Sequence, residues 1–269
     1  MKNENLEALF SKLWKQYCLL NPNAEKIQKL VKEQGENPLN DHLAFRSFGV
    51  HPIQISNLSV FFEENDYYKT GEYEFPEKKL IAQSFSHPSN DYPRIFISQL
   101  VVEAFSTFLQ EFVSKQIHSM DKKLLIGDRL FTSGQVWKNL DYKTFSRIKE
   151  ESEYAAWLLV HGFCANHFTL SLNSMKLFEN INQFNEFLES KGFVLNDSGG
   201  KIKGSPELYL EQSSTISAKR KHSFVDGDYD VSGCYYEFAK RYPMEGGKLF
   251  DGFVSKSADK IFESTDKSA

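Results

Sequence analysis

Two histidines and one glutamate, His42, His167 and Glu237, occupy comparable positions in segments whose patterns predict β-strands. Two imidazoles and one carboxylate form a ligand set that leaves coordination positions open for substrate and dioxygen on non-haem Fe(II). The same ligand types also suit Zn or Mn, so ligand type alone does not fix the metal. The sequence therefore predicts a mononuclear metal site at these three residues.

Arginine side chains lie on the same predicted strand faces as the candidate ligands. Residues separated by an even number of positions share a strand face, so Arg46 lies on the face of His42 and Arg241 on that of Glu237. Burying an unpaired charge costs several kcal/mol, so an ordinary core strand would not place such residues inward without partners. Alternatively these faces point to water, and His42 and Arg46 are surface residues. Strand parity alone leaves the two interpretations level.

Arg46 has a specific role if its face lines a cavity. At ~3.3 Å per residue it lies ~13 Å along the strand from His42, so its guanidinium could meet the far carboxylate of a short diacid whose 2-oxo acid end chelates the metal. A planar guanidinium suits that carboxylate better than a lysine ammonium. Arg241 is expected instead to pair with surface carboxylates.

The other candidate groups carry less weight. His161 ends a predicted helix, where a histidine is typical of a C-terminal cap, and His222 begins a predicted strand and is an alternative cavity residue. The cysteines Cys18, Cys164 and Cys234 are odd in number and unclustered, which favours reduced, buried or inert thiols. No G-x-G-x-x-G, P-loop, G-x-S-x-G or H-E-x-x-H motif occurs, which excludes the common nucleotide-binding, hydrolase and zincin interpretations.

Hydrophobic periodicity predicts the elements that position these residues. Helical spacing of apolar residues predicts two opening helices, over residues 4–20 and from Pro22 to about 34. A strand is predicted next at 41–48, followed by a helix at 53–65. After a turn-rich stretch, two more strands are predicted at 80–85 and 94–101. Residues 103–162 look mainly helical. A second series follows, with a strand at 166–172, a helix at 175–191 and strands at 193–195, 208–212, 222–225 and 235–239.

The two halves of the chain share one pattern. N-D-H-L-A-F-R-S-F around His42 corresponds to A-N-H-F-T-L-S-L-N around His167, and each precedes an amphipathic helix and strands with a Gln-Ser pair, at Gln83 and Gln212. We therefore predict an α+β fold in which two paired β-α-β-β-β modules form a central metal-binding cavity, with N-terminal and mid-chain helices. The predicted single domain, residues 1–269, comprises a helical cap (1–40), a first β module (41–102), a helical connector (103–162), a second β module (163–243) and a C-terminal tail (244–269).

The composition is that of a globular protein, since the 269 residues are 41% hydrophobic and 25% charged. The net charge of −4, with interspersed signs, gives no basic stripe for a phosphate backbone, so we expect no nucleic-acid partner. The longest apolar runs fall far short of the ~18 residues of a membrane span, and the first residues do not resemble a signal peptide. We expect a cytoplasmic protein without a membrane partner, whose oligomeric state the sequence does not set.

Six motifs occur in order from about residue 40 to the C-terminus. They are D-H-L-A-F-R-S-F (41–48), S-E-Y-A-A-W-L (152–158), H-G followed by N-H-F-T (161–169), Q-S-S-T (212–215), G-C-Y-Y-E-F-A (233–239) and I-F-E-S-T (261–265). Together they resemble the 2-oxoadipate dioxygenase/decarboxylase family, also called hydroxyglutarate synthases. The resemblance implies a vicinal-oxygen-chelate-like fold, Fe(II) ligands at His42, His167 and Glu237, and a substrate that contacts His42, His167 and, through its distal carboxylate, Arg46.

The resemblance also implies a reaction. It takes 2-oxoadipate, a small 2-oxo diacid, and O₂ to 2-hydroxyglutarate and CO₂, with lysine catabolism as the setting. The chain ends soon after Glu237, where characterised members carry further sequence, and this leaves a related 2-oxo acid open as the substrate. Two other functions stay possible at this point: a metal-dependent isomerase or lyase of the same fold, which would not consume O₂, and a non-enzymatic metabolite-binding module.

Overall fold

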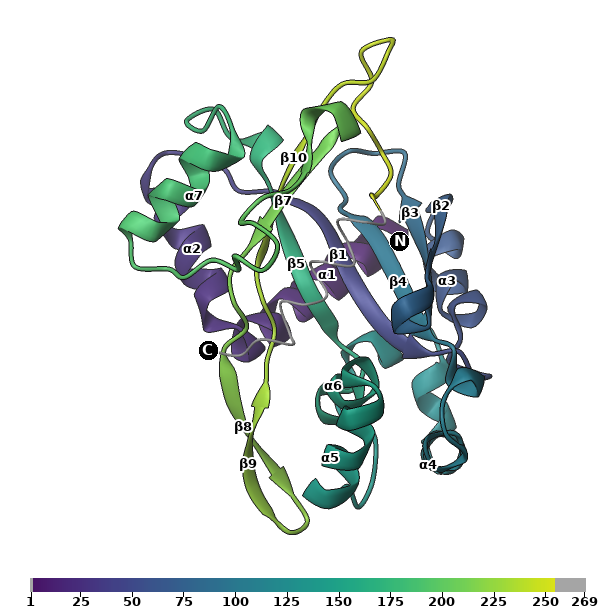
Figure 1. Cartoon of the computed structure of the whole chain (residues 1–269). Coiled ribbons are helices and arrows are strands. Elements are labelled where there is room, and N and C mark those ends of the chain that lie inside the picture. Colours follow the sequence, from purple (N-terminus) through teal and green to yellow (C-terminus); the bar gives the residue numbers. More distant parts are fainter. Residues whose placement is uncertain (1, 255–269) are drawn as a thin grey trace.

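The computed structural model describes residues 2–254, which fold into a mixed α+β arrangement (Figure 1). The helices are α1 Lys2–Leu20, α2 Pro22–Glu33, α3 Ile55–Glu64, α4 Thr107–His118, α5 Tyr142–Glu151, α6 Glu153–His161 and α7 Ile181–Ser190. The strands are β1 Asn40–Phe48, β2 Tyr68–Phe75, β3 Leu80–Ser86, β4 Arg94–Leu100, β5 Ala165–Ser171, β6 Lys203–Ser205, β7 Leu210–Ser214, β8 Lys219–Phe224, β9 Gly227–Ser232 and β10 Glu237–Arg241.

Two modules of related topology share one curled eight-stranded sheet, in the order β2-β3-β4-β1-β5-β10-β7-β6. In each module the first strand pairs in parallel with the last, β1 with β4 and β5 with β10. The modules join through the antiparallel pairing of β1 with β5. The predicted α+β pairing of two modules is therefore observed, and it places β1, β5 and β10 side by side in the middle of the sheet.

Some local predictions differ from the structure. The strand predicted at 193–195 is absent, because that segment forms only an isolated bridge between Leu195 and Thr215. Strand β2 lies in the stretch predicted to be turns, because its exposed sheet edge carries charged residues such as Lys69 and Glu72 instead of an apolar pattern. The strand predicted at 222–225 is present as part of β8, but it is not part of the sheet of the second β module, because β8 and β9 form a separate two-stranded sheet. Helix α7 begins at Ile181 and not at residue 175, because the side chain of Asn180 caps it by accepting from the amide of Gln183.

Strand β1 is buried on both faces along nearly its whole length. On one face Phe45 packs against Phe62 of α3 and against Phe131, with ring centroids 5.9 and 4.9 Å apart. On the other face lie His42 and Arg46, both buried. The interpretation that this second face points to water is therefore wrong.

Helix α1 crosses behind the middle of the sheet and supports β5 from that side (Figure 1). Trp14 and Tyr17 of α1 contact Phe168 of β5, each with a centroid distance of 5.1 Å. The buried Tyr17 hydroxyl also donates to the backbone carbonyl of Tyr235, just before β10. The N-terminal helices thereby fix the two strands that carry His167 and Glu237.

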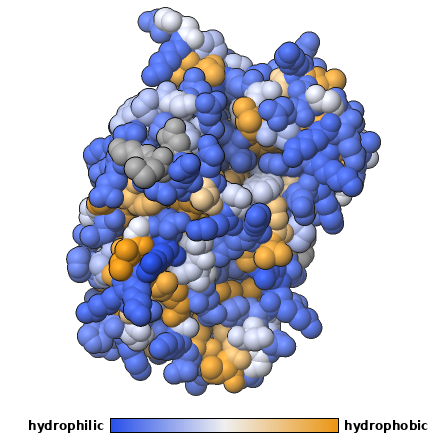
Figure 2. All heavy atoms as spheres, turned by 180° about the vertical axis from the view of Figure 1, so that it is seen from behind, coloured by the Kyte–Doolittle hydropathy of each residue, from blue (hydrophilic) through white to orange (hydrophobic). Residues whose placement is uncertain are grey.

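Hydrophobic residues are concentrated inside the protein. Figure 2 shows a mostly hydrophilic face on which hydrophobic residues form scattered patches. Cys164 and Cys234 are buried and Cys18 is half-buried, and all three are unpaired thiols. Burial raises the pKa of the Cys234 thiol to about 12, in line with the expectation of inert cysteines. Among the described residues no helix is both long and apolar enough to span a membrane.

Candidate metal centre

The side chains of His42, His167 and Glu237 converge at the middle of the sheet, one from each of the three adjacent central strands. Their candidate ligand atoms all lie within 4.8 Å of one another. His42 Nε2 is 3.3 Å from Glu237 Oε1, and His167 Nε2 is 3.6 Å from Glu237 Oε2. The three residues are 2%, 6% and 1% exposed. In residues 2–254 this is the group of His, Cys and acidic side chains that could hold a metal ion.

His42 is oriented by its neighbour in the chain. Its Nδ1 donates to Asp41 Oδ2 at 2.8 Å, which leaves the lone pair of Nε2 on the side of Glu237. The Thr169 hydroxyl lies 3.0 Å from Nε2. Burial alone would lower the pKa of His42, but its contacts with Asp41 and Glu237 raise it, so a proton and a metal cation would compete for the same nitrogen.

His167 has a different set of partners. Its Nδ1 lies 2.9 Å from the Tyr235 hydroxyl and 3.1 Å from the Asn166 side-chain amide. The Asn166 contact is through its side-chain nitrogen, which donates, so it favours an Nδ1 that accepts, whereas the Tyr235 hydroxyl can donate or accept. In the tautomer in which Nδ1 donates to Tyr235, the Nε2 lone pair faces Glu237. Burial lowers the pKa of His167 to about 3, so its imidazole is neutral at physiological pH, the form that binds metals.

Glu237 supplies the negative charge of the group. Burial would raise the pKa of this carboxyl, but His167 and His42 hold it below its ordinary value. The side-chain amide of Gln212, on the neighbouring strand β7, donates to Oε1. Two imidazole lone pairs and a carboxylate that face one another in a dry interior form a set that a divalent cation stabilises, so the residues fit a metal ion.

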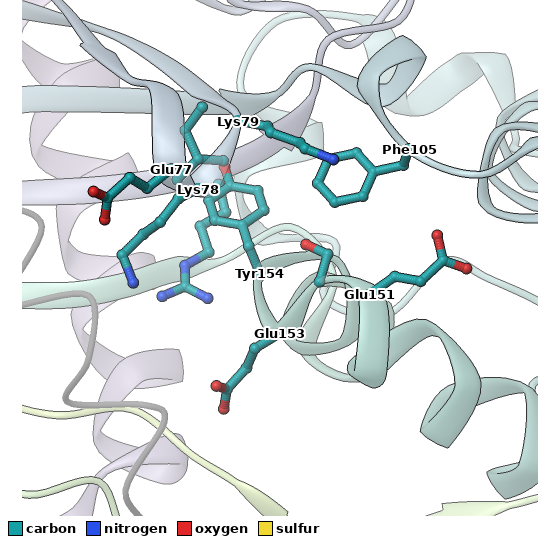
Figure 3. A pocket seen from close by; sticks show the side chains of 10 residues that line it. Glu77, Lys78, Lys79, Phe105, Glu151, Glu153 and Tyr154 are labelled. Carbon is teal, nitrogen blue, oxygen red and sulfur yellow. The ribbon is translucent and has the colours of Figure 1, made fainter.

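Arg46 is buried on the same strand face as His42, as strand parity predicts. Its guanidinium carbon lies 4.9 Å from the ring centroid of Tyr154 and 4.7 Å from that of Trp157, both on α6. Hydrogen bonds lock these rings, from Trp157 Nε1 to the carbonyl of Gly233 and between the Tyr154 hydroxyl and Ser98. Arg46 and Tyr154 line a pocket of about 350 Å³, surrounded by charged side chains of both signs (Figure 3).

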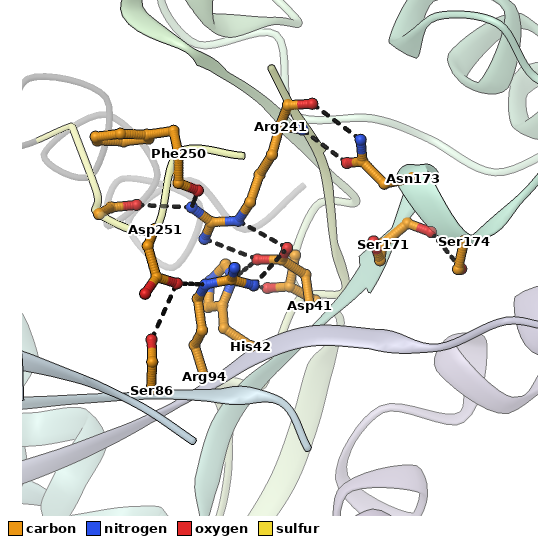
Figure 4. Close-up of polar contacts among 12 residues, drawn as sticks. Asp41, His42, Ser86, Arg94, Ser171, Asn173, Ser174, Arg241, Phe250 and Asp251 are labelled. Carbon is orange, nitrogen blue, oxygen red and sulfur yellow. Dashed lines mark hydrogen bonds and ion pairs between the residues drawn. The ribbon is translucent and has the colours of Figure 1, made fainter. Parts of the chain in front are cut away.

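Arg241 corrects the sequence-based expectation of a surface ion pair. The side chain is 2% exposed, and it pairs with the buried carboxylate of Asp41 at 2.8 and 2.9 Å (Figure 4). Burial would raise the pKa of Asp41, but Arg241, His42 and Arg94 hold it well below its ordinary value. The carboxylate that orients His42 therefore stays ionised.

Two further histidines lie apart from this group. His161 ends α6 but does not cap it, because its Nε2 contacts the carbonyl of Ser232 at 2.7 Å in the neighbouring hairpin. Burial lowers its pKa to about 3, so it lacks the positive charge of a helix cap. His222 lies on β8 in the separate hairpin, outside the group formed by His42, His167 and Glu237.

Several residues that complete the site were missed from the sequence. Asp41, Tyr235 and Gln212 each contact a candidate ligand, yet no role was predicted for any of them. Asp41 directly precedes His42, and Gln212 belongs to the repeated Gln-Ser pair. Neighbouring residues of a regular strand point to opposite faces, so Asp41 was not expected to contact His42. The register of β1 with β5 shifts between Asn40 and His42, and this irregularity lets Asp41 reach the ring of His42.

Comparison with known proteins agrees with this arrangement. A model of the 2-oxoadipate dioxygenase/decarboxylase family matches residues 9–133 and 129–260. The chain belongs to this family. A chloroplastic/amyloplastic 2-oxoadipate dioxygenase/decarboxylase of Oryza sativa subsp. japonica is 38% identical over 96% of this chain and 78% of its own length. The I-F-E-S-T motif at 261–265 lies outside the described residues.

Several solved structures share the fold of this chain. The Oryza sativa hydroxyglutarate synthase in complex with 2-oxoadipate has a TM-score of 0.91 and 37% identity, and the match covers 98% of this chain and 93% of that chain. The crystal structure of a putative hydrolase from Shewanella frigidimarina has a TM-score of 0.88 and 44% identity, and the match covers 93% of this chain and 98% of that chain. A glyoxalase superfamily protein of Ralstonia eutropha, with a TM-score of 0.81 at 18% identity, shows a vicinal-oxygen-chelate-like fold alone, over 95% of this chain and 87% of that one.

Proposed function

We propose that this protein is an Fe(II)-dependent dioxygenase that converts 2-oxoadipate and O₂ to 2-hydroxyglutarate and CO₂. Both atoms of O₂ enter the products, so the equation balances without a further reductant or water. The observation that carries the proposal is the buried group of two histidines and a glutamate in a chain of the 2-oxoadipate dioxygenase/decarboxylase family. The Oryza sativa relative, solved with 2-oxoadipate, supports the substrate class.

The chain's own residues would hold the metal and set its surroundings. His42, His167 and Glu237 would bind Fe(II), which when bound supplies the binding and activation of O₂ next to a 2-oxo acid. Asp41 accepts the Nδ1 proton of His42, and Tyr235 can accept that of His167. Asp41 fixes the tautomer of His42, and donation from Nδ1 of His167 to Tyr235 would leave its Nε2 lone pair free, so that both Nε2 atoms could act as ligands.

Arg46 would bind the distal carboxylate of the substrate. A buried guanidinium in a low-dielectric interior attracts an anion strongly, and it offers two parallel N–H donors to a carboxylate. The rings of Tyr154 and Trp157, which pack against the guanidinium, restrict where it can lie. A cation held at a fixed place favours a diacid over a monoacid, and one chain length over its neighbours.

The proposal is tested by anaerobic reconstitution with Fe(II), followed by O₂ uptake with 2-oxoadipate, 2-oxoglutarate and 2-oxoisocaproate in parallel. We expect uptake coupled to CO₂ release, with the six-carbon diacid preferred over the shorter diacid and over the monoacid. EDTA-treated protein is the control and should consume no O₂. Bound iron without uptake for any of the three acids would contradict the dioxygenase and favour an O₂-independent reaction.

A further inference from the structure

Arg241 makes more contacts than a structural ion pair needs, and these contacts lead in two directions. Its guanidinium donates through Nε and Nη2 to the two oxygens of Asp41, at 2.8 and 2.9 Å. Through Nη1 it donates to the backbone carbonyls of Phe250 and Gly252, at 3.0 and 2.8 Å. One planar group therefore holds a carboxylate of β1 and a segment beyond β10 (Figure 4).

The first direction leads to a candidate metal ligand. Asp41 Oδ2 accepts from Arg241 and from Nδ1 of His42, so the position of the carboxylate fixes the tautomer and the ring direction of His42. Arg94 adds a contact to Asp41 at 3.4 Å, which is too long for a strong hydrogen bond. Arg241 is therefore the main group that orients the carboxylate behind His42.

The second direction leads to residues 250–253, which we call the strap. Within the strap, Asp251 accepts from Arg94 Nε at 2.5 Å and from the hydroxyl of Ser86 at 3.0 Å. Phe253 is 9% exposed, and its ring meets the ring of His42 edge to face, with centroids 4.7 Å apart. Its backbone amide donates to the Tyr73 hydroxyl at 3.1 Å. The strap therefore packs an aromatic ring directly on the ligand that Asp41 orients.

We propose that Arg241 is a positioning residue that couples the seating of the strap to the orientation of His42 for the metal ion. The inference rests on the proposed role of His42 as a metal ligand. The fork geometry of a guanidinium is essential to it, because a lysine ammonium cannot hold both carboxylate oxygens and two separate carbonyls in one plane. Binding of a metal at His42 should then stabilise the strap, and release of the strap should weaken the metal, since coupling between two sites is reciprocal.

The test uses Co(II) as the probe, with its affinity and visible spectrum as one readout and amide hydrogen exchange of the strap as the other. Three variants separate the contacts. Arg241→Lys removes the forked contacts of Arg241 with Asp41 and with the strap. Asp41→Asn removes the anionic partner of His42 but leaves the contacts of Arg241 with the strap carbonyls. Arg94→Lys is the matched control, because it disturbs the strap through Asp251 and has little contact with Asp41. Neither readout depends on O₂ chemistry, so failure of the proposed reaction would leave the result interpretable.

In the wild-type protein we expect Co(II) to slow exchange of the Phe253 amide. Arg241→Lys should weaken Co(II) binding by about 10–100-fold, the usual effect of losing a group behind a metal ligand, and Co(II) should no longer slow strap exchange. Asp41→Asn should weaken Co(II) to a similar extent with the strap still protected. Arg94→Lys should speed strap exchange only in part, because Arg241 still holds the carbonyls of Phe250 and Gly252. It should therefore weaken Co(II) binding by clearly less than Arg241→Lys does, and Co(II) should still slow strap exchange.

Three results would overturn the inference. The first is an Arg241→Lys protein whose Co(II) affinity and strap protection are those of the wild type. The second is an equal loss of Co(II) affinity in Arg94→Lys, which would indicate general loosening of the network. The third is an unchanged Co(II) affinity in Asp41→Asn. That result would refute the link from Asp41 to His42 even if Arg241→Lys fails to fold.

Discussion

Replacing Glu237 with glutamine tests the metal centre with little change of shape. Glutamine has the volume of glutamate, but it removes the negative charge that faces the two imidazoles at 3.3 and 3.6 Å. A neutral amide oxygen is a much poorer ligand for a divalent cation than a carboxylate. We therefore expect Glu237→Gln to fold and to lose the stabilisation that a bound metal gives the wild-type protein.

The expected size of that stabilisation follows from mass action and chain length. Metal at about 100 times its Kd stabilises the folded state by about 2.7 kcal/mol. An unfolding entropy of about 2.1 cal/mol/K per residue gives about 0.6 kcal/mol/K for a chain of 269 residues. Dividing the first by the second predicts a rise in Tm of about 5 °C for the wild type and a rise near zero for Glu237→Gln.

The assay is thermal unfolding with and without Mn(II), which avoids oxidation during the scan. Glu245→Gln is the matched control, because Glu245 is an exposed carboxylate near the same end of the chain. It should keep the full metal-dependent rise in Tm. A Glu237→Gln protein that still gains about 5 °C with Mn(II) would refute the assignment of Glu237 as a ligand.

Three further substitutions test other parts of the account. Arg46→Lys should lower kcat/KM for 2-oxoadipate by roughly 10–150-fold, which corresponds to the loss of a hydrogen bond to a charged group worth about 1.5–3 kcal/mol. Iron should stay bound, and kcat/KM for a 2-oxo monoacid should not change. Equal losses for both acids would contradict a carboxylate-binding role. Tyr17→Phe should lower the free energy of unfolding by about 1–3 kcal/mol in urea titrations, because the carbonyl of Tyr235 loses its buried donor, and an unchanged midpoint would show that contact to be neutral. Burial lowers the pKa of His161 to about 3, so between about pH 6.5 and 3 the unfolded chain binds a proton that the folded chain does not, and stability falls as the pH falls. His161→Gln should reduce this pH dependence of the unfolding free energy by about 1.4 kcal/mol per pH unit. An identical slope would mean that His161 is not buried as a neutral group.

Much of the fold followed from periodicity, because strands buried on one or both faces leave strong hydrophobic patterns. The duplicated segments around His42 and His167 predicted the paired modules, and these strands lie together in the sheet. Strand β2 escaped detection because an exposed edge strand with charges such as Lys69 and Glu72 has no apolar alternation. The hairpin of β8 and β9 could not be assigned to its own sheet, because strand pairing depends on contacts that local pattern does not encode.

The candidate site was predictable to the extent that ligands lie on regular strands. Parity placed Arg46 on the face of His42, but it could not distinguish a face that lines the interior from one that meets water. The contacts of Arg241 lay beyond sequence reasoning, because its partner Asp41 is 200 positions away. Such long-range pairs arise only when the curled sheet brings β1 and β10 together at its centre.

The most direct test of the central claim is the stoichiometry of one reaction. Fe(II)-reconstituted protein is mixed with a limiting amount of 2-oxoadipate in a sealed cell, and O₂ consumed, CO₂ released and 2-hydroxyglutarate formed are measured together. We predict one mole of each per mole of 2-oxoadipate, with none in Glu237→Gln. Loss of 2-oxoadipate without O₂ consumption, or equal turnover by Glu237→Gln, would contradict it.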